Sequence, residues 1–403
     1  MSSSLRVIVV GAGPVGCAAA GMLAERDIDV LLLEAAPDLP RELRASTFHP
    51  ATLDLIDRFG VVPEMLARGL RAPRFSYRHR RTGLVARFDL GILADVTDHP
   101  FRLQCEQYKF CEVMVDRLAR SDRVDIRFGA EVVGVSPSDD RATLALRSGE
   151  ELAADAVVAA DGAASAVRKS LGLGFEGMTY EDRYLVVSTP FEMADRLDDL
   201  DYVNYISGPD EWLVLLRTVD LWRALFPVGD GETDAEALSD ESAQRRLRGV
   251  AGVDGPFTVA HRTLYRVHQR VADRFRVGRV VLMGDAAHIN NPLGGMGMNG
   301  GIHDAVLLGA SLAGWLRGDI SEQQLDQHAD LRRTMAIDYA MRHSHQNALS
   351  LAAPDPHMRQ QALDRLAERA ADPQQARAYL RDAAMVSAVE AMRPALREAG
   401  VVG

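Results

Sequence analysis

The chain has 403 residues, 47% of them hydrophobic and 26% charged, which is long enough for at least two soluble globular domains. Its formal net charge of −11 excludes the basic surface that nucleic-acid binding needs, and its three cysteines form neither a disulfide framework nor a zinc motif. The N-terminus lacks a signal-peptide pattern and no stretch is apolar enough to span a membrane, so we expect a cytoplasmic protein without a membrane span.

The first elements are predicted to be a strand, a glycine-rich turn, a helix and a second strand. An apolar run at 5–10 precedes the sequence GAGPVG at 11–16. An alanine-rich helix to about Arg26 and a strand at 29–34 complete the unit. A GxGxxG motif between strand and helix, with an acidic residue ending the second strand, predicts a dinucleotide site without separating FAD from NAD.

Each residue type in this turn has a physical reason. Gly11 permits the tight turn, Gly13 lets the backbone approach a pyrophosphate, and Gly16 lets helix and strand pack closely. The helix start offers unpaired N–H groups to phosphates, and the carboxylate that ends the second strand can bind a ribose diol. The predicted contacts are Gly11, Gly13, Pro14, Val15, Gly16, Glu34 and Ala35.

The middle of the chain alternates between strand and helix patterns. A hairpin is predicted at 74–90, a helix at 108–121, and strand pieces at 124–135. An apolar strand at 154–160 ends abruptly at Asp161.

The segment 177–276 lacks glycine loops and carries its aromatic residues in strand patterns at 201–207, 211–217 and 221–227. We predict a separate, sheet-rich domain. Alternation in the last strand divides its side chains into two sets, one of which should cover the cofactor: Leu221, Arg223 and Leu225 on one face, and Trp222, Ala224 and Phe226 on the other.

A second glycine-rich stretch, RVVLMGDAAHINNPLGGMGMNGG, occupies residues 279–301. The remaining chain is predicted to be helical. Ser321 with Gln324 forms a capping box, Asp372 is an N-cap before Pro373, and Gly400 is expected to end that helix.

Together, GAGPVG, VVAADGAASAVR at 157–168 and the stretch at 279–301 resemble the single-component FAD-dependent aromatic hydroxylases, or class A flavoprotein monooxygenases, which include para-hydroxybenzoate hydroxylase. In that family three distant segments bind one FAD. The resemblance therefore implies that the second glycine-rich stretch completes the first nucleotide site.

The resemblance also implies individual roles. Asp161 would serve the FAD pyrophosphate and the nicotinamide, Asp285 would bind the ribityl chain, and Pro292 would lie beside the oxygen-reactive flavin carbon. The N–H groups at Met298 and Asn299 would stabilise the anionic reduced ring. Further predicted FAD contacts are Arg44, Gln104, Val132, Gly284, Gly295 and Gly297.

The implied fold is α/β. A Rossmann-like FAD-binding domain of the glutathione-reductase type would comprise residues 1–72, 100–176 and 278–318. An inserted mixed-sheet substrate domain would comprise 73–99 and 177–277, and a helical C-terminal tail 319–403.

The implied reaction uses NADH or NADPH to reduce FAD, and O₂ to form a flavin C4a-hydroperoxide that hydroxylates a small aromatic or heteroaromatic substrate. Acidic residues near Glu34 slightly favour NADH. Besides Pro292, the predicted catalytic residues are His49, as a proton relay, and Arg223, which would contact the flavin. Tyr205 and Arg217 are predicted to meet the substrate.

No metal site is predicted, because His343 and His345 lack a ligand set; His288 is expected to form a structural hydrogen bond. The sequence is compatible with a homodimer and does not fix the oligomeric state. It names neither the substrate nor the position oxygenated.

Several alternatives stay open on sequence alone. A FAD-dependent reductase or oxidase of the same fold, and a quinone-ring hydroxylase, would carry similar motifs. A flavin halogenase should show a WxWxI segment, which the three tryptophans do not form. An NAD dehydrogenase leaves the two later motifs unexplained, and a non-enzymatic flavin-binding regulator needs no activated ring.

Overall fold

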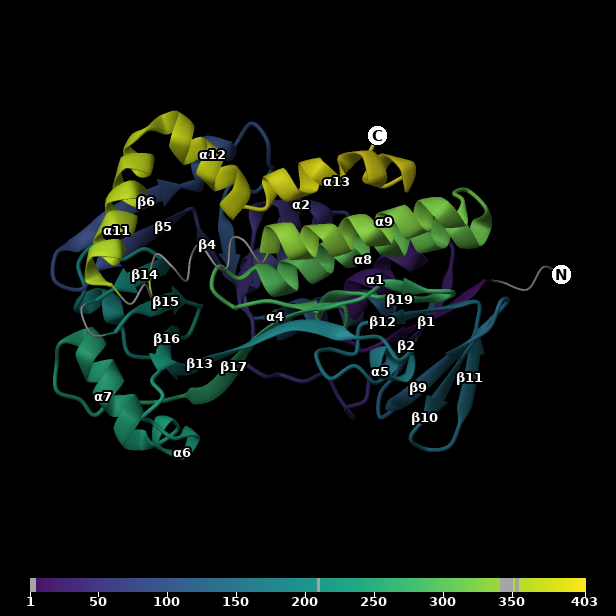
Figure 1. Ribbon diagram of the computed structural model, residues 1–403, viewed down its shortest axis with the longest axis horizontal. Coiled ribbons are helices and arrows are strands. Elements are labelled where there is room, and N and C mark those ends of the chain that lie inside the picture. Colours follow the sequence, from purple (N-terminus) through teal and green to yellow (C-terminus); the bar gives the residue numbers. More distant parts are fainter. Residues whose placement is uncertain (1–4, 209–210, 341–350, 352–354) are drawn as a thin grey trace.

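The computed structural model describes residues 5–208, 211–340, 351 and 355–403. Two sheets, one at each end of the molecule, are linked by the long strands β13 (Phe175–Thr189) and β17 (His261–Ala272), which run between them (Figure 1). His343 and His345 lie outside the described residues.

The first sheet has six strands in the order β18-β19-β12-β1-β2-β8. Strand β1 pairs in parallel with β2 and β12, and β12 pairs in parallel with β19. Parallel strands end at the same edge, so the three predicted motifs, which begin at the ends of β1, β12 and β19, meet there. The strands are β1 (Arg6–Val10), β2 (Asp29–Leu33), β8 (Val124–Arg127), β12 (Ala156–Ala159), β18 (Arg276–Val277) and β19 (Val280–Leu282).

Helices pack on this sheet through a common apolar core. Helix α1 presents the small buried residues 17–21, which allows α8 to approach closely. A three-stranded meander adds its apolar side chains to the same core. The helices are α1 (Pro14–Ala24), α4 (Gln107–Leu118), α5 (Ala166–Ser170), α8 (Met296–Arg317) and α9 (Glu322–Met335); the meander is β9 (Val132–Pro137), β10 (Ala142–Leu146) and β11 (Glu151–Ala154).

The second sheet has eight strands in the order β20-β17-β13-β16-β15-β14-β5-β6. The predicted hairpin at 74–90 joins it because β5 pairs in parallel with β14, far along the chain. Besides β13 and β17, its strands are β5 (Arg74–His79), β6 (Gly83–Asp89), β14 (Val203–Ser207), β15 (Leu213–Arg217), β16 (Trp222–Val228) and β20 (His288–Ile289).

The predicted alternation in β16 is confirmed, and it separates the two faces of this sheet. Trp222, Ala224 and Phe226 join one apolar cluster, which includes side chains of α7 (Asp240–Ala251) and α6 (Asp234–Ala237). Leu225 packs with the opposite cluster, which includes side chains of α11 (Pro356–Ala371) and α12 (Pro373–Ala383). In Figure 1 these two helix pairs lie on opposite sides of the sheet.

A small sheet, β3 (Thr47–Phe48), β7 (Arg102–Gln104) and β4 (Leu70–Ala72), supports the cofactor loops. Helices α2 (Pro50–Asp57) and α3 (Val62–Arg68) connect its strands. Short helical turns complete the described elements: η1 (Leu90–Leu93), η2 (Met193–Asp195), η3 (Gly284–Ala286) and η4 (Ala336–Ala340).

The C-terminal helices confirm two predicted caps and correct one boundary. Ser321 and Gln324 form the capping box of α9, and the Asp372 side chain accepts N–H bonds at the start of α12. The helix that follows Pro373 ends at Ala383, however, and Gly400 ends a separate helix, α13 (Val386–Glu398). Met385 adopts a left-handed φ of 61° between the two, a break that no glycine or proline marks.

The α/β fold with a helical C-terminal region is confirmed; the domain boundaries stay a prediction. None of the described helices has the length and apolar character that a membrane crossing requires. The described residues also contain no cluster of three or more potential metal ligands.

Candidate active site

The three motif segments touch one another around the start of α1. A Cβ at Gly11 would lie 2.4 Å from the carbonyl oxygen of Ala160, the residue before Asp161. A Cβ at Gly284 would lie 2.7 Å from a methyl group of Val15. Segments separated by more than 100 residues therefore form one continuous surface, as the sequence motifs imply.

The first turn leaves room in front of the helix. Gly11 has φ of +100°, and a Cβ at Gly16 would lie only 1.8 Å from the Gly11 carbonyl oxygen. A Cβ at Gly13, in contrast, would meet nothing within 4 Å. The helix that begins at Pro14 thus points its unpaired N–H groups at open space, which fits a pyrophosphate.

The Glu34 carboxylate is held by main-chain N–H groups at the end of β2. Its oxygens accept hydrogen bonds from Ala12 N (2.8 Å) and Ala36 N (2.9 Å). Each carboxylate oxygen can accept a further bond, so the half-buried group can also bind a ribose diol. Ala35 is exposed beside it, and Val132 is buried in the adjoining core.

Asp161 organises the second motif. Its carboxylate accepts from Ser165 Oγ (2.6 Å) and Val167 N (3.1 Å), which fixes the start of α5. Arg168 then donates to the carbonyl oxygens of Ala163 (2.9 Å) and Ala286 (2.8 Å). The second motif is therefore bonded directly to the third.

A buried ionic network holds the third motif. Asp304 accepts from Gly284 N (2.9 Å), His288 Nε2 (2.8 Å) and Arg332 Nε (2.6 Å). Burial alone would raise the pKa of Asp304, but Arg332, His288 and the Gly284 N–H outweigh it and lower the pKa to about 2. His288 forms the expected structural bond.

Sequence reasoning missed Asp304 and Arg332. A single carboxylate inside the apolar helix segment IHDAVLL is a detectable signal of a buried, paired charge. Its partner lies 28 residues further along the chain and becomes evident only from helix packing.

Asp285 behaves differently from Asp304. Its side chain is exposed to solvent, yet desolvation by the surrounding protein raises its pKa, against the opposing effects of His288 and Arg44. The Asp285 carboxylate is therefore accessible to a ligand from the solvent side. This position suits a group that binds a ribityl hydroxyl.

The loop from Pro292 to the start of α8 turns through two glycines with positive φ. Pro292 is exposed, and its carbonyl accepts from Gly295 N (3.0 Å). Gly294 and Gly295 have φ of +107° and +68°, which bring the chain into α8 at Met296. The first turn of α8, including the half-buried Gly297 and Met298, presents N–H groups suited to a flavin ring edge.

Asn299 and His49 hold this loop from behind. The buried Asn299 side chain accepts from His49 N (2.9 Å) and donates to Thr47 O (2.8 Å). The fully buried His49 ring lies with Nε2 2.9 Å from Gly294 O, so Nε2 carries the proton. Burial lowers the pKa of His49 well below its usual range, which keeps the ring neutral. These contacts let His49 position the loop, and its role as a proton relay stays a prediction.

Gln104 offers the donor expected of a FAD contact. Its Oε1 accepts from Thr47 Oγ1 (3.0 Å), while its buried Nε2 has no partner among the described residues. A buried amide nitrogen without an acceptor is costly, and a bound cofactor would provide one.

Arg223 connects the second sheet to the segment that contains Leu43 and Arg44, called here the cofactor loop. Its guanidinium donates to the carbonyl oxygens of Leu43 and Arg44, both at 2.7 Å. The Arg44 side chain itself is exposed and pairs with Glu42. Arg223 thus positions the segment that carries Arg44. Alternation in β16 predicts the face on which Arg223 lies but not these partners.

The amino-acid sequence matches a protein family described as FAD binding domain over residues 4–343. It is 34% identical to para-nitrophenol 4-monooxygenase of Pseudomonas sp. (strain WBC-3), covering 88% of this chain and 89% of that protein. The crystal structure of p-nitrophenol 4-monooxygenase PnpA from Pseudomonas putida DLL-E4 matches with a TM-score of 0.89 at 31% identity, covering 95% and 98% of the two chains. The chain belongs to the FAD-dependent aromatic monooxygenases.

A second relative extends the range of ring chemistry in the family. 6-Hydroxy-3-succinoylpyridine 3-monooxygenase HspB of Pseudomonas putida (strain DSM 28022 / S16) is 34% identical over 83% of this chain and 86% of its own. This aromatic monooxygenase is thus a flavoprotein that uses FAD, with NAD(P)H as co-substrate.

A cluster of aromatic side chains in this monooxygenase lies next to residues 292–296, called here the flavin loop. Tyr77 and Tyr205 stack with ring centroids 4.9 Å apart, and Tyr184 meets Trp212 edge-on at 5.3 Å. The same apolar cluster, called here the aromatic face, includes Leu293 and Met296 from the loop and residues of the C-terminal helices.

The structure separates the two residues predicted to meet the substrate. Tyr205 lies in the aromatic face. Arg217 lies on the opposite face of the sheet, where it pairs with Glu192 (3.2 Å) and lies 5.6 Å from the Trp222 ring. Arg217 follows Leu216 in β15, and alternation directs it away from the flavin loop, so we do not retain it as a substrate residue.

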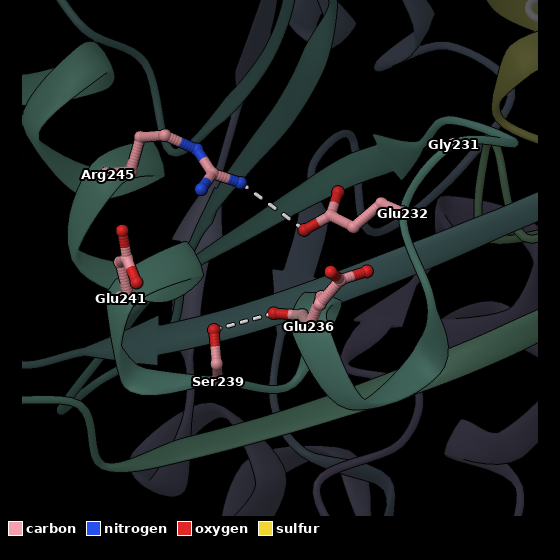
Figure 2. A pocket seen from close by; sticks show the side chains of 6 residues that line it. All are labelled: Gly231, Glu232, Glu236, Ser239, Glu241 and Arg245. Carbon is pink, nitrogen blue, oxygen red and sulfur yellow. Dashed lines mark hydrogen bonds and ion pairs between the residues drawn. The ribbon is translucent and has the colours of Figure 1, made fainter.

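A hollow of about 400 Å³ occurs elsewhere, between α6 and α7. Figure 2 shows its lining, in which Arg245 faces Glu232 and the Ser239 hydroxyl donates to the Glu236 carbonyl. The three carboxylates around it are unsuited to a phosphate-bearing cofactor, and it shares no residue with the three motifs.

Proposed function

We propose that this monooxygenase hydroxylates a small monocyclic phenol or hydroxylated heteroaromatic ring bound on the aromatic face, with O₂ as the oxidant. The observation that carries the proposal is the continuity of the aromatic face with the 293–296 loop. FAD, when bound, supplies the activation of O₂ and the transfer of one oxygen atom. We further propose a cytoplasmic homodimer.

The relatives support a single-ring substrate. The chain covers nearly the whole of proteins named for p-nitrophenol and a hydroxypyridine. It covers only 58% of 6-methylpretetramide 4-monooxygenase of Streptomyces rimosus, at 32% identity.

The chain's own residues would hold the cofactor in three places. Gly13 and the start of α1 would receive the pyrophosphate, while Gln104 Nε2 and Asp285 would bind the chain between phosphate and ring. The N–H groups at the start of α8 would stabilise negative charge on the ring edge.

The aromatic face would orient the substrate and exclude water. Helices α11 and α12 pack over it, and the Tyr379 hydroxyl lies 2.9 Å from that of Tyr77. A dry environment limits loss of the activated oxygen to solvent. His49 would act indirectly, through the position of Gly294.

The test is NAD(P)H consumption by the FAD-loaded protein with and without phenols, hydroxypyridines and aromatic acids. We expect at least one compound to accelerate consumption and to gain one oxygen atom by mass. If reduction proceeds equally with every compound and no product gains oxygen, a reductase or oxidase replaces the proposal. Turnover restricted to long-chain quinone precursors would instead indicate a quinone-ring hydroxylase.

A further inference from the structure

Arg102 is a buried cation beside the aromatic face, and no described carboxylate pairs with it. Arg102 is only 3% exposed. Its guanidinium lies 4.1 Å above the Phe75 ring, and its Nε has no partner in the part of the chain that the structure describes. Its two polar contacts, from Nη1 to Tyr205 Oη and from Nη2 to Ala383 O, are both 3.5 Å long, beyond the usual range of hydrogen bonds.

Other buried arginines in the molecule are better satisfied. Arg332 donates to Asp304 at 2.6 Å, and Arg223 donates to two carbonyl oxygens at 2.7 Å. Arg168 has carbonyl partners at 2.8 and 2.9 Å. Arg102 therefore has donors that the described residues leave unused.

Groups around Arg102 do not neutralise its charge. Ala383 O is at the C-terminus of α12, whose dipole supplies only a fraction of a negative charge. Burial raises the pKa of Tyr77, and it raises the pKa of Tyr379 to about 12, although Arg102 opposes both shifts. These two phenols stay neutral at physiological pH.

The position of Arg102 connects it to both halves of the site. It lies two residues before Gln104 in β7, so alternation places both side chains on the same side of that strand. Its other neighbours, Phe75 and Tyr205, belong to the aromatic face. A ring bound on that face could therefore reach the guanidinium.

We propose that Arg102 binds an oxyanion carried by the aromatic substrate, either the ionised phenol oxygen or a carboxylate on the ring. This inference rests on the proposed function and specifies its substrate class. A buried, unpaired charge is costly to the fold, and an incoming anion would remove that cost while gaining charge-assisted hydrogen bonds. If the anion is the phenol oxygen, the same contact favours the electron-rich phenolate.

The experiment measures binding to the FAD-loaded full chain without NAD(P)H, so that no turnover occurs. The probes are 4-nitrophenol, whose ionised form is coloured, and benzoate, which lacks a phenol group. Arg102→Met removes the charge and Arg102→Lys retains it. Arg71→Met is the matched control, because Arg71 is exposed on β4 of the same small sheet and pairs in register with Leu103 rather than Arg102.

We expect Arg102→Met to weaken at least one probe by about 10- to 100-fold, as for loss of a charged hydrogen bond. Arg102→Lys should retain part of the affinity, and Arg71→Met should match the wild type. If 4-nitrophenol loses affinity and its bound form is less ionised, the anion is the phenolate. If benzoate loses affinity and 4-nitrophenol does not, the anion is a carboxylate.

Thermal unfolding of the ligand-free holoenzymes separates binding from a structural role. Removal of an unpaired buried charge should leave the Tm unchanged or raise it. Probe affinities within twofold of wild type, or a lower Tm for Arg102→Met without recovery of binding in Arg102→Lys, would overturn the inference. Failure of the wild type to hydroxylate any phenol or hydroxylated heteroaromatic ring would instead refute the proposed function.

Discussion

The three motif segments, 11–16, 157–168 and 279–301, form a cofactor cradle. This cradle and the aromatic face are built by different kinds of contact. In the cradle, most contacts involve main-chain atoms. Glycines allow the segments to approach closely, and main-chain N–H groups donate to the carboxylates of Glu34 and Asp161. In the aromatic face, side chains from the hairpin, the second sheet and the C-terminal helices meet through stacked and tilted aromatic rings. Main-chain sites tolerate few substitutions, whereas a side-chain surface can change its ligand by changing a few residues.

The comparison predicts that the largest single effect comes from the buried ionic network of the cradle. Asp304→Asn removes the charge that pairs with Arg332 and leaves that arginine unpaired. We expect a loss of about 3–5 kcal/mol in the free energy of unfolding, measured by urea denaturation. Asp285→Asn is the control: it should leave stability nearly unchanged but weaken FAD binding. Equal stability losses in the two variants would contradict this division.

The glycines of the first turn should separate folding from binding. A Cβ at Gly16 overlaps the Gly11 carbonyl, so Gly16→Ala should lower the free energy of unfolding by about 3 kcal/mol. A Cβ at Gly13 meets no atom of the described residues within 4 Å, so Gly13→Ala should fold normally yet bind FAD at least about tenfold more weakly. Thermal unfolding without FAD and flavin fluorescence titration measure the two effects. A Gly13→Ala protein with unaltered FAD affinity would place the pyrophosphate elsewhere.

Mild acid should weaken the contact between α2 and α8 through a buried histidine. Thr52 Oγ1 lies 2.9 Å from His303 Nε2, and burial lowers the pKa of His303 from 6.5 to about 3. Because the folded pKa lies below the unfolded pKa, this stability is present above about pH 6.5 and declines as the pH falls toward 3. The loss at pH 5 is about 2 kcal/mol, at about 1.4 kcal/mol per pH unit.

Urea denaturation of the wild type and of His303→Gln between pH 5 and 7 tests this prediction. In His303→Gln, the free energy of unfolding should depend less on pH than in the wild type. The dependence that remains should include that of the buried His49, whose pKa is also lowered. An unchanged slope in His303→Gln would show that folding does not shift the pKa of His303.

The smallest predicted effect distinguishes the two faces of the second sheet. Arg223→Met removes two hydrogen bonds to the cofactor loop and should lower kcat/KM by about tenfold, through a misplaced loop. Arg217→Met, on the neighbouring strand and the opposite face, should change kcat/KM less than about threefold. Steady-state kinetics measure both, with a compound that accelerates NAD(P)H consumption in the test of the proposed function. If Arg217→Met lowered kcat/KM more than Arg223→Met does, the Arg217 face of the second sheet would be the one next to the cofactor.

Much of the cofactor half could be predicted because its signals are local in sequence. Gly11, Gly13 and Gly16 follow a strand, open a helix and carry fixed physical tasks, so a short segment reveals the turn. The capping residues Ser321 and Asp372 likewise mark helix starts wherever they occur. The break at Met385 escaped prediction because an ordinary residue adopts a left-handed conformation there.

The sequence by itself thus determined the α/β class, the FAD motifs and the strand pattern of the second sheet. Only the tertiary structure decided which side chains share a surface. Tyr77, Tyr205 and Tyr379 come from three distant segments, and strand pairing with helix packing brings them together. The same long-range packing leaves Arg102 buried without a counter-charge among the described residues. Local patterns encode backbone conformation, whereas the identity of a buried neighbour depends on how the whole chain closes.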